Sequence, residues 1–274
     1  MTALPSYKVL LSTGSLPLLS LKEIFVLAKE TGFDGCDLVI QRHLDHGAYK
    51  ETLQECVAIL PVYALHVPFE RLKVWGKPVE ALVRSVALAK EFDIPLVNFH
   101  PPSWFYLEFT FLRWFRKVKD FQRELRCEKV CVALENMPLT EGEIKRRPYL
   151  LNNFNDMIKF GVKRNLYFTF DTTHAATFEH GVIDAFLAYH KTGRLQHVHM
   201  SDHASERSHL LPGAGNLPLE ELLRTMDAAG YDRTMSLEVA PHELPSMRGH
   251  LEAALREASS FLKGHGRAGR DGQQ

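Results

Sequence analysis

The stretch 166–175, Leu-Tyr-Phe-Thr-Phe-Asp-Thr-Thr-His-Ala, joins a strand-like run to two side chains that can do chemistry. Five residues of high β propensity lead into the carboxylate of Asp171, and the imidazole of His174 follows three positions later. Parallel α/β folds build their active sites where strands end and loops begin. This stretch therefore predicts a metal-binding or catalytic position at the carboxyl end of a strand.

The same arrangement recurs along the chain. Histidine, aspartate or glutamate stands at or near the end of six strand-like runs, as His66, His100, Glu135, Asp171, His174, His199 and Glu238. A lone histidine at such a place is usually a core residue, but seven polar residues at matching positions indicate a common site. Imidazoles and carboxylates without a thiolate suit a hard or borderline divalent ion such as Mn, Zn, Mg or Co. We expect Glu135 and Glu238 to flank a bound substrate.

Eight strand-like runs that alternate with eight segments of helical periodicity must position these side chains. The expected strands are residues 8–13, 35–40, 63–67, 96–99, 129–134, 166–170, 195–200 and 235–239. The expected helices are residues 21–31, 49–60, 78–92, 111–126, 150–160, 182–190, 219–229 and 247–262. Gly161 is expected to end the fifth helix, and a loop rich in proline and glycine, 210–217, precedes the seventh.

Strand–helix units at a spacing of roughly 30 residues form a parallel sheet. Eight such units favour a closed (β/α)8 TIM barrel over an open doubly wound sheet, and no Gly-x-Gly-x-x-Gly turn follows the first strand. We predict a single α/β domain over residues 1–262. Residues 263–274, with four glycines and no apolar periodicity, are predicted to be a disordered tail.

Composition restricts the partners. Lys+Arg and Asp+Glu both number 33, so no global basic field attracts nucleic acid, although a local patch would suffice. The four cysteines lack the C-x-x-C spacing of zinc or redox motifs and are expected to be reduced, mostly buried thiols. The sequence shows neither a signal peptide nor an apolar run near the ~18 residues of a membrane span. We expect a cytoplasmic protein with no membrane partner, and homo-oligomerisation stays open.

Several short motifs occur at these strand ends and turns. They are Gly32-Phe33-Asp34-Gly35, His100-Pro101, Leu134-Glu135-Asn136, Asp171-Thr172-Thr173-His174, His197-Val198-His199, Pro212-Gly213-Ala214-Gly215 and Ser236-Leu237-Glu238. Through them the chain, over about residues 8–262, resembles the xylose isomerase-like TIM-barrel superfamily. That superfamily contains sugar and sugar-phosphate isomerases and epimerases, and also endonuclease IV-type nucleases (AP endonuclease family 2) that act at abasic sites.

The ketose 3-epimerase branch of this family holds one divalent ion. By resemblance, its ligands fall on Glu135, Asp171, His199 and Glu238. The two glutamates of that branch also exchange the proton next to the substrate carbonyl, one removing it and the other returning it on the opposite face. A further glutamate matches Glu141, and a histidine that contacts the substrate matches His174. The arginine that binds substrate in that branch falls on His209, which is a departure.

The nuclease branch binds three zinc ions. Its additional histidine ligands match His66, His100, His174 and His209. An aspartate of that branch falls on Arg207, which cannot bind a metal, although Asp202 or Glu206 could substitute for it. The first-strand histidine of the nucleases has no counterpart in residues 8–14. The third zinc site is therefore predicted to be incomplete.

The function that these observations favour is a metal-dependent isomerase or epimerase acting on a small sugar, sugar phosphate or related hydroxy-carbonyl compound. One to three ions of manganese or zinc would be its cofactor. Arg207 is the best candidate for a substrate phosphate or carboxylate. Two alternatives stay open: a zinc phosphodiesterase that cleaves DNA at abasic sites, and a barrel with a degenerate metal site and no catalysis.

Overall fold

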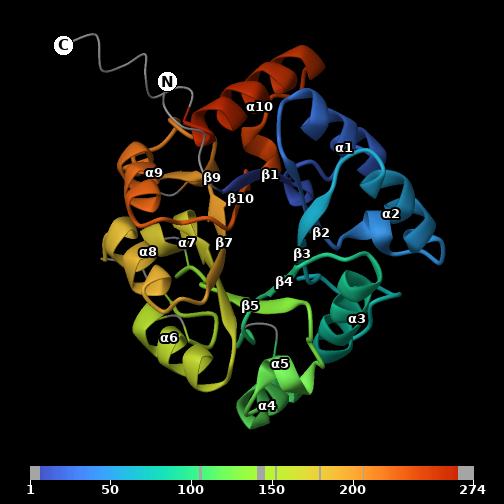
Figure 1. Ribbon diagram of the computed structural model, residues 1–274, viewed down its shortest axis with the longest axis vertical. Coiled ribbons are helices and arrows are strands. Elements are labelled where there is room, and N and C mark those ends of the chain that lie inside the picture. Colours follow the sequence, from blue (N-terminus) through green and yellow to red (C-terminus); the bar gives the residue numbers. More distant parts are fainter. Residues whose placement is uncertain are drawn as a thin grey trace.

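The computed structural model describes residues 7–104, 107–140, 146–151, 153–178, 180–205 and 207–264. Eight parallel strands close into a barrel in the order β1-β10-β7-β6-β5-β4-β3-β2, and helices surround it (Figure 1). The predicted (β/α)8 barrel is thus confirmed. Parallel strands need crossover connections, which the helices supply, and closure leaves the barrel without an edge strand.

Each expected strand is present, with bounds that shift by at most two residues. The barrel strands are β1 (Lys8–Ser12), β2 (Gly35–Val39), β3 (Val62–His66), β4 (Leu96–Phe99), β5 (Cys131–Glu135), β6 (Tyr167–Asp171), β7 (Leu195–Met200) and β10 (Thr234–Leu237). Nearly all their residues are buried, since one side of each strand faces the barrel interior and the other faces the helices.

The longer helices cover the outside of the barrel. The helices are α1 (Leu21–Glu30), α2 (Tyr49–Val57), α3 (Pro78–Glu91), α4 (Phe109–Lys117), α5 (Phe121–Glu124), α6 (Phe154–Lys163), α7 (Thr172–Ala176), α8 (Val182–His190), α9 (Leu219–Ala228) and α10 (Arg248–Leu262). The short α7, by contrast, follows β6 directly and carries His174 beside Glu135. Three short 3-10 helices complete the set: η1 (Thr13–Ser15), η2 (Arg42–Leu44) and η3 (Pro241–Glu243). No helix among the described residues is long and apolar enough to cross a membrane.

Two helices differ from expectation. The segment 111–126 forms two helices, because the chain turns at Val118 and the Asp120 side chain caps α5 by accepting a hydrogen bond from the Arg123 N–H. The prediction that Gly161 ends its helix was wrong, since Gly161 lies within α6. A Cβ at this position would lie 2.5 Å from the Phe168 ring, so the glycine permits close approach of helix and strand.

An antiparallel hairpin that the sequence did not predict follows β7. It consists of β8 (Asp202–Ala204) and β9 (Arg207–Leu210). The Ala240 N–H donates to the His209 carbonyl at 2.8 Å, which ties the hairpin to the loop after β10. The hairpin thereby lies against the carboxyl rim of the barrel.

Asp202 organises the loop that follows this hairpin. Its carboxylate accepts hydrogen bonds from the backbone N–H groups of Gly213 at 2.9 Å, Gly215 at 2.9 Å and Leu217 at 3.0 Å. A Cβ on Gly215 would lie 2.4 Å from Asp202 Oδ1, so only glycine fits here. The Pro-Gly-Ala-Gly motif is therefore a loop wrapped around one carboxylate.

Candidate metal centre

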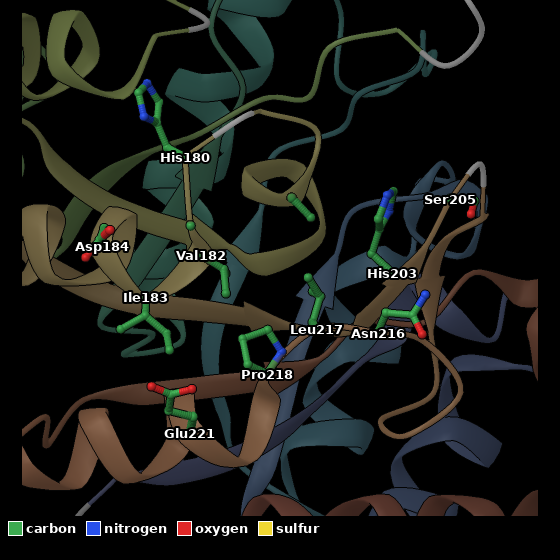
Figure 2. Close-up of a pocket in the computed structure, with 12 residues that line it drawn as sticks. His180, Val182, Ile183, Asp184, His203, Ser205, Asn216, Leu217, Pro218 and Glu221 are labelled. Carbon is green, nitrogen blue, oxygen red and sulfur yellow. The ribbon is translucent and has the colours of Figure 1, made fainter.

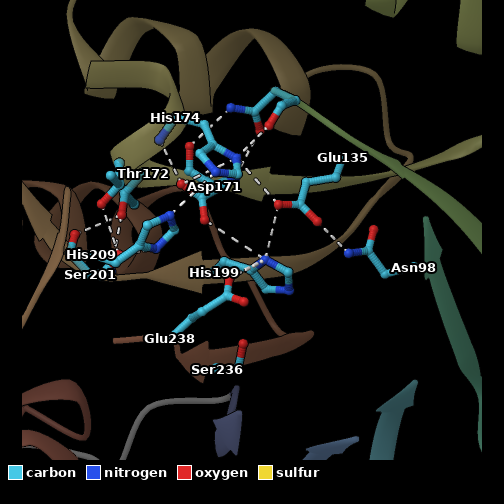
Figure 3. A network of polar contacts seen from close by, with 12 residues as sticks. Asn98, Glu135, Asp171, Thr172, His174, His199, Ser201, His209, Ser236 and Glu238 are labelled. Atoms are coloured by element: carbon cyan, nitrogen blue, oxygen red, sulfur yellow. Dashed lines mark hydrogen bonds and ion pairs between the residues drawn. The ribbon is translucent and has the colours of Figure 1, made fainter. Parts of the chain in front are cut away.

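Four of the predicted ligands converge at the carboxyl rim of the barrel. Glu135, Asp171, His199 and Glu238 each offer one ligand atom, and these atoms all lie within 4.8 Å of one another. Figure 3 shows the four side chains pointing toward one another. Glu135 and Asp171 end β5 and β6, His199 lies in β7, and Glu238 directly follows β10. We call these four residues the primary cluster.

The contacts within the primary cluster leave two buried atoms for an additional partner. His199 Nδ1 lies 2.8 Å from Glu238 Oε2, 3.3 Å from Glu135 Oε1 and 3.8 Å from Asp171 Oδ2. Asp171 Oδ2 and both ring nitrogens of His199 form no hydrogen bond with any residue that the structure describes, and of these three atoms Nδ1 and Oδ2 face the primary cluster. Buried polar atoms normally have a partner, so these two atoms and their carboxylate neighbours fit a divalent cation.

Side-chain hydrogen bonds extend the pattern of backbone pairing beyond the ends of the strands and hold the backbone at Asp171 in place. The Asn136 amide accepts from the Asp171 N–H at 2.7 Å and donates to the Asp171 carbonyl at 3.0 Å. The Thr172 hydroxyl donates to the Ser201 carbonyl at 2.8 Å and accepts from the Ser201 N–H at 3.1 Å. Asp171 Oδ1 caps α7 by accepting from the His174 N–H at 2.6 Å. Only Oδ2 of Asp171 therefore faces the primary cluster.

A second group of possible ligands consists of His66, His100 and Glu135. The two histidines approach through their Nε2 atoms, which are 3.1 Å apart. Glu135 Oε2 lies 3.2 Å from His66 Nε2 and 3.5 Å from His100 Nε2. Two nitrogens bound at ~2.1 Å to one tetrahedral zinc are ~3.4 Å apart, so these separations suit a shared ion.

A third group consists of Asp171, His174 and His209. His209 reaches it from the hairpin, and its Nε2 lies 3.3 Å from His174 Nε2. His209 has a backbone φ of +55°, a conformation that non-glycine residues rarely adopt and that clusters at functional sites. The backbone of His209 is therefore strained in the conformation that points its imidazole toward His174.

Burial and the mutual charges shift the pKa values of these groups. Burial opposes the charge on His174, but Asp171 and Glu135 outweigh it and raise the pKa of His174 to about 9. Burial likewise opposes the charge on Glu238, and His199 outweighs it and lowers the pKa of Glu238 to about 2. Burial prevails at His100, whose pKa falls. The neighbouring His199 therefore favours the charged form of Glu238.

The structure places the other predicted residues outside these groups. Arg207 is 61% exposed and pairs with Glu243, with Nε–Oε1 at 3.2 Å and Nη2–Oε2 at 2.5 Å. Both carboxylate oxygens of Asp202 accept hydrogen bonds from backbone N–H groups, which argues against Asp202 as a substitute zinc ligand. Glu141 and Glu206 lie outside the described residues, as does 265–274, most of the predicted tail.

Sequence reasoning missed two buried polar residues that contact the ligands. Asn98 in β4 donates a hydrogen bond to Glu135 Oε2, and Asp37 in β2 lies 3.3 Å from His199 Nε2. Both are fully buried inside strands of otherwise apolar residues. A charged or amide side chain in the middle of a buried strand was the signal that could have identified them, since such groups are rarely buried without a partner.

Aromatic rings lie beside the second group. Phe69, which is 58% exposed, is nearly parallel to His100 with ring centres 6.2 Å apart. Phe69 and His66 are nearly perpendicular with ring centres 6.0 Å apart, and Tyr149 and His100 are arranged in the same way at 6.1 Å. Phe69 and Tyr149 therefore form an apolar surface beside the imidazoles of the second group.

A pocket of about 520 Å³ lies apart from the ligand groups, between the start of α8 and the loop before α9 (Figure 2). His180, Asp184, His203, Asn216 and Glu221 supply its polar lining. None of its lining residues is a predicted ligand, so it is separate from the candidate metal centre.

Comparison with known proteins places this geometry in a family. The model of a family described as xylose isomerase-like TIM barrel matches residues 25–265. The chain belongs to this family. An uncharacterized protein of Mycobacterium bovis is 26% identical over 289 residues, which cover 95% of this chain and 98% of the relative. The resemblance inferred from the motifs is confirmed.

Two further similarities carry functional names. A putative hydroxypyruvate isomerase of Streptomyces coelicolor is 45% identical over 79 residues, which cover 28% of this chain and 25% of that protein. The crystal structure of a D-tagatose 3-epimerase-like protein superposes with a TM-score of 0.70 at 21% identity, covering 96% of this chain and 98% of the other. At that identity the structural likeness shows the fold alone.

Proposed function

We propose that this protein is a metal-dependent isomerase or epimerase of a small sugar, sugar phosphate or related hydroxy-carbonyl compound. The observation that carries the proposal is the primary cluster, in which three ligand side chains are almost fully buried while Glu238 is 22% exposed. Glu238 can therefore reach a substrate that enters at the carboxyl rim. The similarity of part of the chain to a putative hydroxypyruvate isomerase supports this class of reaction.

Glu135, Asp171, His199 and Glu238 would hold the ion, manganese or zinc, in this reaction. Bound there, the ion would polarise the substrate carbonyl and stabilise the negative charge of an enediolate. The oxygen and nitrogen donors of the cluster suit either metal. His66, His100, His174 and His209 are proposed as ligands of further ions if more than one binds.

The two glutamates carry the proton. Glu238 is open to the rim, so its carboxylate is placed to remove the proton from the carbon next to the carbonyl. Glu135 lies three strands away round the barrel and faces the cluster from another side. In an epimerisation, one glutamate takes the proton from one face of that carbon and the other returns a proton to the opposite face.

Three residues are proposed to contact the substrate. His174 lines the cluster with its side chain 11% exposed, and Glu141 is assigned through the family resemblance alone. Arg207 is assigned to a substrate phosphate or carboxylate. Because Arg207 pairs with Glu243, such an anion would have to replace that carboxylate, and Arg207 would then couple substrate binding to the hairpin.

The variant Glu238→Gln tests this function because it keeps the shape of the side chain and removes the base. We expect proton exchange at the substrate carbon, followed as deuterium incorporation from D2O with a panel of ketoses and hydroxypyruvate, to fall ~10²–10⁴-fold. Metal content measured on the same samples separates loss of the base from loss of the ion. Glu221→Gln, in the separate pocket, is the matched control. Full exchange activity in Glu238→Gln would contradict the assignment.

The abasic-site nuclease is kept as a second candidate, because the second and third groups could hold two additional ions. Elemental analysis of protein purified without chelators distinguishes the two functions. About one ion per chain, manganese in particular, supports the isomerase. Two or three zinc ions, together with incision of an abasic duplex that is lost in His66→Ala or His100→Ala, would support the nuclease. Retained metal without turnover of either substrate class would identify a binding protein.

A further inference from the structure

Asp37 is a buried carboxylate inside the barrel, directly beside the primary cluster. It lies in β2, is fully buried, and has no lysine or arginine partner within the described ranges. The pairing of β2 with β3 shifts its register between Cys36 and Asp37, an irregularity of the kind that re-aims a side chain near active sites. A charge at such a place costs stability unless its contacts compensate for the loss of water.

The contacts of Asp37 are two histidines and a serine. Its Oδ2 lies 3.3 Å from His199 Nε2 and 3.4 Å from His197 Nε2, and it accepts a hydrogen bond from Ser236 Oγ at 3.2 Å. All three side chains meet the same oxygen of Asp37, so this carboxylate is the shared acceptor of the group.

The imidazole ring of His199 lies between the primary cluster on one side and Asp37 on the other. Its Nδ1 faces Glu238, Glu135 and Asp171 in the primary cluster, whereas its Nε2 faces Asp37. A histidine that offers the Nδ1 lone pair to a cation must carry its proton on Nε2. A carboxylate beside Nε2 favours that tautomer, orients the ring and makes the imidazole a better donor.

A second histidine holds Asp37 in place. His197 Nε2 lies 3.1 Å from Ser236 Oγ, and His197 Nδ1 lies 2.7 Å from Thr234 Oγ1. The His197 ring meets His199 edge to face at 4.9 Å. His197 and Ser236 thus hold the carboxylate against His199.

We propose that Asp37 is a positioning residue of the metal centre, which sets the Nε2-protonated tautomer of His199 so that Nδ1 faces the ion. The inference rests on the proposed function, since it needs the primary cluster to bind a divalent cation. Asp37 itself does not reach the substrate. It acts through His199.

The first test is metal affinity, measured by calorimetric titration of chelator-treated protein with Mn²⁺ or Zn²⁺ alone. Asp37→Asn keeps the size of the side chain but presents an amide that can donate to Nε2 and so favour the wrong tautomer. We expect the affinity of the primary cluster to fall ~10–100-fold, the usual effect of losing such an outer partner. Glu221→Gln, in the separate pocket, is the matched control, because it also replaces a carboxylate by an amide but lies apart from Asp37 and the primary cluster, and its affinity should stay within threefold of wild type.

The second test needs no variant. In zinc-loaded wild-type protein labelled with ¹⁵N-histidine, long-range ¹H–¹⁵N spectra should show His199 protonated on Nε2. A proton on Nδ1 would overturn the inference even if Asp37→Asn fails to fold. Asp37→Asn that binds as tightly as wild type would overturn it while the metal centre stands. Wild-type protein that binds neither ion would instead overturn the proposed function.

Discussion

Replacement of Asp202 by alanine tests whether this residue organises a loop or binds a metal. In the structure its carboxylate accepts three loop N–H groups, from Gly213, Gly215 and Leu217, at 2.9–3.0 Å. Asp202→Ala removes both oxygens that accept these three hydrogen bonds. If the residue serves only the loop, the variant should lose stability and keep its bound ions.

The expected loss of stability follows from these contacts. Hydrogen bonds to a charged group contribute ~1.5–3 kcal/mol each when buried. The loop is partly exposed, so water replaces part of each bond, and we assign about 1 kcal/mol to each of the three. The sum of about 3 kcal/mol corresponds to a fall in Tm of roughly 6–12 °C for a domain of this size. Asp202→Asn keeps one oxygen acceptor and should fall between the two proteins.

Thermal unfolding measured by circular dichroism, with elemental analysis of the same samples, is the assay. Asp232→Ala is the control, since the Asp232 side chain is 61% exposed, and this change should stay within ~0.5 kcal/mol of wild type. A variant Asp202→Ala with wild-type stability that has lost an ion would refute the reasoning. It would show that Asp202 is a ligand and that its loop contacts are of little energetic value.

Two other predictions follow from the packing and charge of single residues. Gly161→Ala places a Cβ 2.5 Å from the buried Phe168 ring and should destabilise the protein by ~1–3 kcal/mol, measured by urea unfolding. Val162→Ala, at the neighbouring position that is 44% exposed, is the control and should have a smaller effect. Equal stabilities of the two variants would mean that helix α6 moves freely to accommodate the methyl group. The pKa of His174 is raised to about 9 by Asp171 and Glu135, so its contribution to stability is full below the unfolded pKa of ~6.5 and is lost as the pH rises through 9. Chelator-treated wild-type protein should therefore lose roughly 2–3 kcal/mol more than His174→Gln between these pH values, and parallel pH profiles would count against a charged His174.

Hydrophobic periodicity in the sequence determined most of the secondary structure. The strands 96–99 and 195–200 and the helix 182–190 have the predicted bounds in the structure. The spacing of apolar residues indicates which segments are strands and which are helices, because each must bury one face in a layered α/β protein. Eight alternating units then determined the barrel, and the carboxyl ends of parallel strands necessarily meet at one rim. For this reason Glu135, Asp171 and His199 could be assigned to one site from their positions in the chain alone.

Only the tertiary structure decided how the remaining residues act. Gly161 read as a helix end, yet it serves a close approach to Phe168, a residue of the following strand. Asp202 read as a possible ligand, yet its oxygens face the backbone of a loop eleven to fifteen residues later. Local sequence patterns report backbone preference and burial, but they do not report which distant group a polar side chain will meet.

Asp37 shows the same limit most clearly. In the sequence it is one charged residue in an apolar strand, and its partners His197, His199 and Ser236 are 160 or more residues away. Barrel closure places β2 and β7 on either side of β1 and β10, and their inward side chains then meet across the interior. The types and spacing of the ligands could be read from the chain, whereas the groups that orient them depend on closure of the barrel, because contacts across its interior have no counterpart in local sequence.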